Sequence, residues 1–61
     1  MQAPTHYLMC IKEAEETIER LERQLARMAK NQPGRKYLHE RIACEKNIIT
    51  LLERDYLEAV A

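Results

Sequence analysis

The first half of the chain carries apolar residues separated alternately by four and three positions. They are Tyr7, Ile11, Ala14, Ile18, Leu21, Leu25 and Met28. This spacing places every member on one side of an α-helix, like the core positions of a coiled coil. The segment from Thr5 to Gln32 contains no glycine or proline and is rich in Glu, Arg, Leu and Ala, which favour helix. We therefore predict a helix over about residues 5–31.

The second half repeats the spacing with Leu38, Ile42, Glu45, Ile49, Leu52, Tyr56 and Ala59. This set predicts a second helix over about residues 35–60. Between the helices, residues 31–34 contain Pro33, which pushes Gln32 out of the helical region, and Gly34, which permits a positive φ. A connection this short returns the second helix antiparallel beside the first. The sequence predicts an all-α helical hairpin that forms a single domain over residues 1–61.

Folding at that turn brings the two sets of core positions together in successive layers. Met28 meets Leu38, Leu21 meets Glu45, and each later layer follows by the same alternation. Ala14 then meets the larger Leu52. The predicted hairpin core consists of Tyr7, Ile11, Ala14, Ile18, Leu21, Leu25, Met28, Leu38, Ile42, Ile49, Leu52 and Tyr56.

The second helix also carries a stripe of apolar residues beside its core positions, and a two-helix contact leaves this stripe without a role. The stripe consists of Tyr37, Cys44, Ile48 and Leu51. Since a domain of 61 residues rarely buries enough apolar surface alone, we predict that the stripe is a dimer face and that two hairpins form a homodimeric four-helix bundle. Eight of the ten basic residues lie in the half near the turn, and eight of the ten acidic ones in the half near the termini. An antiparallel dimer sets opposite charges together, so we expect that orientation.

Composition narrows the class of partner. The ten basic and ten acidic residues give a net charge of zero, which disfavours a nucleic-acid partner. The longest apolar run, residues 7–11, is too short to span a membrane, and neither a basic leader nor a small-residue cleavage site accompanies it. We expect a cytoplasmic protein without a membrane partner.

The sequence offers no catalytic or cofactor-binding motif. It has no serine, and its only glycine is Gly34, so it lacks a phosphate-binding loop. His6 and Cys10 share a helix face, but His39 and Cys44 lie in the other half of the hairpin, which excludes a four-ligand zinc site within one chain. The same separation predicts two free thiols. We expect no enzyme activity, no cofactor and no metal.

The sequence leaves the roles of two features open: the polar residue Glu45 and the apolar group near the two termini. Glu45 occupies a core position, where it either fixes the register through Arg41 or Gln24 or lies at the rim of the contact. At the end of the hairpin that holds both termini, acidic residues surround apolar ones. These candidate partner-binding residues are Leu8, Met9, Leu57, Val60, Glu53 and Glu58. They form either a protein-binding surface or part of the dimer contact.

In size, hairpin layout and lack of catalytic residues, the whole chain resembles small phage-encoded helical-hairpin inhibitors of quorum-sensing transcription factors and pilus assembly ATPases. The resemblance rests on architecture and implies a protein-binding inhibitor in the cytoplasm of a bacterial host. In length and hairpin-dimer layout the chain is also similar to the plasmid RNA-pairing regulator Rop, a resemblance that carries over no functional residue. RNA binding by the basic turn region is therefore the rival interpretation, and charge reversal at Arg35 and Lys36 should abolish it. A structural coiled-coil module is the third interpretation.

Overall fold

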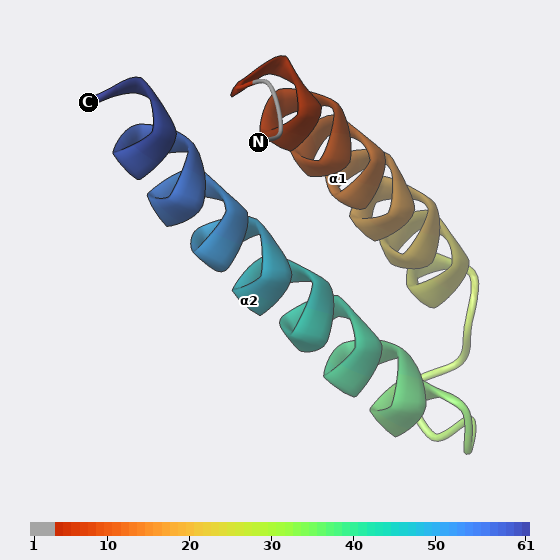
Figure 1. The fold of residues 1–61 in the computed structure, drawn as a ribbon. Coiled ribbons are helices and arrows are strands. Elements are labelled where there is room, and N and C mark those ends of the chain that lie inside the picture. The colour runs from red at the N-terminus through yellow and green to blue at the C-terminus, as the bar shows by residue number, and fades with distance from the viewer. Residues whose placement is uncertain (1–3) are drawn as a thin grey trace.

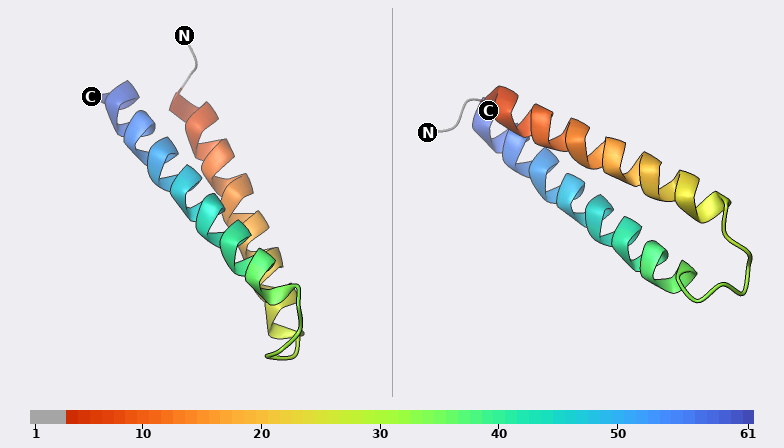
Figure 2. Two further views of the ribbon diagram at one scale, coloured as in Figure 1. Left: turned by 90° about the horizontal axis from the view of Figure 1, so that it is seen from below. Right: turned by 90° about the vertical axis from the view of Figure 1, so that its right-hand side faces the viewer.

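The structure, a computed structural model, describes residues 4–61 as two packed helices. Helix α1 (Pro4–Ala26) and helix α2 (Arg35–Val60) are joined by residues 27–34, and no strand occurs among the described residues. The helices run antiparallel, so that the beginning of α1 lies beside the end of α2 (Figures 1 and 2). The rod that they form measures 46 × 14 × 14 Å. The prediction of an all-α fold made of two helices packed against each other is confirmed.

Helix α1 ends at Ala26, so the expected end at about residue 31 is wrong. The amides of Arg27 and Met28 donate to carbonyls three residues back, at Gln24 and Leu25, over 3.2 and 3.1 Å, which tightens the last turn. The last carbonyls of a helix lack partners within it. Here Arg35 Nη1 lies 3.3 Å from both the Leu25 and the Met28 carbonyl oxygens and donates to them. A positive charge at the C-terminal end of a helix also interacts favourably with the helix dipole. Arg35 therefore stabilises an α1 that ends at Ala26 rather than at about residue 31.

The connection differs from the expected tight turn at Gly34. Gly34 has φ −74° and ψ −8°, and no described residue has a positive φ. Because Gly34 has no side chain, the end of the Met28 side chain can lie close to its backbone. A Cβ placed on Gly34 would lie 2.9 Å from Met28 Cε. Upstream, the Gln32 side-chain oxygen accepts from the Ala29 amide at 3.2 Å, and the Gln32 amide donates to the Ala29 carbonyl at 3.0 Å. The connection therefore takes the eight residues from 27 to 34 rather than four.

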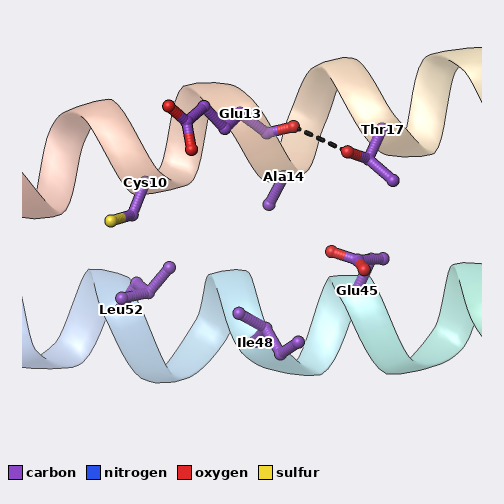
Figure 3. A pocket seen from close by; sticks show the side chains of 7 residues that line it. All are labelled: Cys10, Glu13, Ala14, Thr17, Glu45, Ile48 and Leu52. Atoms are coloured by element: carbon purple, nitrogen blue, oxygen red, sulfur yellow. Dashed lines mark hydrogen bonds between the residues drawn. The ribbon is translucent and has the colours of Figure 1, made fainter.

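This longer connection shifts α2 by about one turn against α1. Figure 3 shows Cys10 opposite Leu52 and Thr17 opposite Glu45, and all four residues line one groove. The expected layers, with Ala14 on Leu52 and Leu21 on Glu45, are therefore wrong. Carried along both helices, the observed offset places Glu45 beside Ile18. The core positions of both helices still face each other because a shift of one turn keeps the same side of each helix inward.

Burial follows the core positions of both helices closely. Ala14, Ile18, Leu38 and Ile42 are buried. The remaining residues of the predicted core are half-buried: Tyr7, Ile11, Leu21, Leu25, Met28, Ile49, Leu52 and Tyr56. Ala59 is exposed, since the shift carries it beyond Tyr7 to the very start of α1. No side chain in the described residues is completely buried, which leaves the hairpin with a thin core.

Candidate interaction surfaces

One face of the hairpin holds an open groove between the two helices. Its volume is about 390 Å³, and it is lined by Cys10, Glu13, Ala14, Thr17, Glu45, Ile48 and Leu52 (Figure 3). Thr17 Oγ1 donates to the Glu13 carbonyl at 3.0 Å, which satisfies its hydroxyl within α1. The groove floor is therefore mostly apolar, with the Glu45 carboxylate at one end. Such a surface suits apolar side chains from a partner.

Glu45 is held by its own helix. Its side chain is 14% exposed, and its Oε1 lies 3.5 Å from Arg41 Nε one turn earlier. Gln24, the other expected partner, is exposed and lines a different cavity. The Tyr37 hydroxyl oxygen, as an acceptor for the guanidinium, and the Glu45 carboxylate both raise the pKa of Arg41 above its usual value. Tyr37, Arg41 and Glu45 follow one another at intervals of about one turn along one side of α2.

The predicted dimer-face stripe of α2 is exposed in the single chain. Tyr37 is 62% exposed, Leu51 51% and Ile48 41%, and Cys44 is a free, exposed cysteine. Cys10, the other cysteine, is free and half-buried. The hairpin therefore leaves this row of apolar side chains on α2 uncovered.

The open end, where α1 begins and α2 ends, exposes the second group of large apolar residues. Met9 is 64% and Leu57 63% exposed, and Leu8 and Val60 are about half exposed. The candidate acidic residues Glu53 and Glu58 are exposed as well. The hairpin itself covers neither this group nor the stripe of α2. Together they include all seven large apolar residues that are exposed in residues 4–61.

The basic half of α1 forms a smaller cavity of about 340 Å³, lined by Arg20, Arg23, Gln24 and Arg27. Arg23 Nη2 binds Glu19 Oε1 at 2.8 Å, an ion pair that neutralises part of this cluster. Arg35, one of the two positions whose charge reversal tests RNA binding, donates to the carbonyls at the end of α1. Lys36, the other of these positions, is exposed.

Metal ligands are sparse. His6 Nε2 and Cys10 Sγ lie 3.6 Å apart on consecutive turns of α1. Within residues 4–61 no group of three or more His, Cys, Asp or Glu side chains is arranged to hold a metal ion. Neither α1 nor α2 is both long and apolar enough to cross a membrane.

Comparison with protein families, with characterised proteins and with solved structures finds no match to this chain.

Proposed function

We propose that this chain is a non-enzymatic, protein-binding regulator that acts as a homodimer of helical hairpins. The observation that carries the proposal is that residues 4–61 expose seven large apolar side chains and bury only four apolar residues. Removing apolar surface from water contributes about 25 cal/mol per Å² before the entropic cost of association is subtracted, so these side chains favour association. Oligomerisation is also a usual way for domains of this size to gain stability.

Two exposed regions suggest two contacts. The stripe of α2 serves the second copy, and the two pairs of hairpin helices form a four-helix bundle. The open end, with Met9 and Leu57 among acidic residues, serves another protein. Flexible methionine next to charge is common at adaptable protein-binding surfaces. A basic surface on the target, such as the DNA-binding face of a transcription factor or part of a motor ATPase, complements the acidic residues.

The proposed setting is the cytoplasm of a bacterial host, with a phage as the source of the protein. The support for it is the resemblance in size and layout to small phage-encoded inhibitors.

Affinity capture with matched variants tests the protein-binding function. Wild-type chain, Leu57→Glu and Ala43→Glu are used as baits in a bacterial lysate under identical conditions. Ala43 is exposed on the same helix but away from the open end, so its variant adds the same charge elsewhere. We expect a protein captured by wild type and Ala43→Glu to be lost with Leu57→Glu. Equal capture by all three baits contradicts a role for the open end.

An RNA-binding regulator of the Rop kind is the second candidate, and the arginine-lined cavity on α1 favours it. Its test is the dependence of RNA affinity on salt, which falls steeply when phosphate contacts dominate. Charge reversal at Lys36 or Arg27 is informative here, whereas reversal at Arg35 disrupts the end of α1. A structural coiled-coil module, the third candidate, predicts partial helicity without a cooperative thermal transition.

A further inference from the structure

We infer that a second copy of this chain docks on the face of the hairpin that carries the α2 stripe, related to the first by a twofold axis crossing Ile48. The inference specifies the homodimer of the proposed function and rests on it.

The helix geometry defines which residues share this face. A residue that precedes a core position lies about 100° around the helix from it. In two antiparallel helices with facing cores, these preceding positions turn to the same side of the pair. The groove agrees with this geometry, since Cys10, Glu13 and Thr17 of α1 border it together with Ile48 of α2. We call this side of the hairpin the groove face.

On α2 the groove face is ordered by chemistry. From the turn to the open end its residues are Tyr37, Arg41, Cys44, Ile48, Leu51, Asp55 and Glu58. Hydrogen-bond donors come first, apolar side chains occupy the middle, and carboxylates come last. Asp55 is half-buried, and the structure gives it no ion-pair partner within residues 4–61.

This order complements itself when reversed. A twofold axis through Ile48, perpendicular to the helices, sets α2 antiparallel to α2 of the second copy. Ile48 then meets its own equivalent, and Cys44 meets Leu51. Arg41 meets Asp55, and Tyr37 meets Glu58. Arg41 has donors to spare after binding Glu45, because a guanidinium carries five N–H groups. Each apolar side chain meets an apolar one, and each acid meets a donor.

The first helix is compatible with the same axis. The observed offset between the helices puts the axis near residue 15 of α1, close to the middle of that helix. Glu13 then lies beside Thr17 of the second copy, and Cys10 beside its Arg20. No like charges meet along either helix. In a parallel dimer the twofold axis runs along the helices and stacks α2 on α1 of the second copy, so Arg41 and Asp55 do not meet and the acidic ends of both copies gather at one end of the bundle.

The arrangement leaves the open-end residues free. Leu8, Glu53, Leu57 and Val60 each follow a core position, so they lie on the side opposite the groove face. Glu58 precedes Ala59 and belongs to the groove face, which assigns it to the dimer and not to the target-binding group. The dimer therefore presents two open ends, one at each end of the bundle, to target proteins.

Mixing two charge-reversed variants tests the pairing of Arg41 with Asp55. In Arg41→Glu alone, two acids meet in each pair, and in Asp55→Arg alone, two cations meet. Mixed in equal amounts, the two variants restore opposite charges in both pairs of the heterodimer. We expect the heterodimer to form about tenfold more tightly than either homodimer, because two surface ion pairs replace two repulsions. Sedimentation equilibrium and native mass spectrometry measure this preference.

Lys46→Glu is the matched control for Arg41→Glu, because Lys46 is exposed on α2 but follows a core position and so lies away from the groove face. Its mixture with Asp55→Arg should show no preference for the heterodimer. Equal preference for the heterodimer in both mixtures overturns the inference. It is also overturned if the wild-type chain is a dimer but Arg41→Glu and Asp55→Arg mix into homodimers and heterodimers in statistical proportions. A wild-type chain that remains monomeric at high concentration overturns the dimer of the proposed function itself.

A crosslink gives a second measurement that does not depend on charge. In a chain with Cys10→Ser and Cys44→Ser, the further change Ile48→Cys places one thiol at the axis, within reach of its equivalent. Mild oxidation should then yield a covalent dimer whose helicity is unchanged. Thr50→Cys in the same background is the control, because Thr50 is exposed on the opposite side. Crosslinking at Thr50 but not at Ile48 contradicts the inferred axis.

Discussion

Single residues decide the shape of the turn. Arg35 reaches back to the carbonyls of Leu25 and Met28, and the bare backbone of Gly34 makes room for the Met28 side chain. A sequence pattern shows neither contact, because both join residues that become neighbours only after the chain has folded back. Gly34 permits a positive φ but does not adopt one, and its missing side chain instead leaves room for the end of the Met28 side chain.

Replacing Arg35 should therefore cost stability. Arg35→Gln removes a charged donor from two carbonyls, and hydrogen bonds to charged groups contribute about 1.5–3 kcal/mol. Because Arg35 is half-buried and these contacts measure 3.3 Å, we expect a loss near the lower end, about 1–2 kcal/mol. Chemical denaturation followed by circular dichroism measures it. Lys36→Gln, one residue on and exposed, should change stability by less than about 0.5 kcal/mol. Equal effects of the two changes contradict the proposed role of Arg35.

Glu45 should be replaceable by an apolar residue. Its half-buried side chain stands at a core position beside the apolar groove, and its ion pair with the exposed Arg41 is 3.5 Å long. Pairs of this kind contribute about 0.3–0.5 kcal/mol, less than the burial of a leucine side chain. We therefore predict that Glu45→Leu raises the free energy of unfolding by about 1 kcal/mol. A lower melting temperature for this variant contradicts the prediction and points to a role of Glu45 in fixing the register.

At the scale of the helices, the periodicity of the sequence predicted both helices but did not predict how they align along their length. The core positions identified both helices, and every predicted core residue is buried or half-buried. The end of α1 was misplaced because residues 27–31 favour helix locally, yet Arg35 stabilises an earlier end. Since one turn more or less preserves the inward side of each helix, periodicity alone does not distinguish the two registers.

An engineered disulfide distinguishes the two registers. In a chain with Cys44→Ser, the change Leu52→Cys places a thiol opposite Cys10, as Figure 3 shows for these two positions. We expect this variant to form an intramolecular disulfide under mild oxidation. Tyr56→Cys in the same background tests the layers expected from the sequence and should remain reduced within the monomer. Mass measurement after blocking free thiols reports both outcomes, and the opposite result supports the unshifted register.

At the scale of the whole molecule, a thin core and two exposed apolar regions are the basis of the proposed association. The sequence pattern already separated the stripe of α2 from the open end, but it left open whether both serve the dimer. The hairpin geometry places the stripe with the groove and places Leu57 and Val60 on the opposite side. In the proposed dimer, one surface therefore remains for the proposed target protein.

Association should make the thermal stability depend on concentration. When a folded dimer unfolds to two chains, the melting temperature rises with protein concentration by mass action. We expect a rise of several degrees between about 2 and 200 µM for the wild-type chain. Ile48→Glu, which places a carboxylate on the groove face, should lower the melting temperature at every concentration. Ala43→Glu, which adds the same charge to an exposed position of α2, should behave like the wild type.

The mass of the wild-type chain in solution tests the central claim most directly. A single chain has a mass of 7.2 kDa, so a dimer has twice that, 14.4 kDa. Sedimentation equilibrium at micromolar concentrations should give the dimer mass, with a cooperative thermal transition in the same buffer. A mass of 7.2 kDa for a fully helical chain whose cooperative melting is independent of concentration would contradict the account.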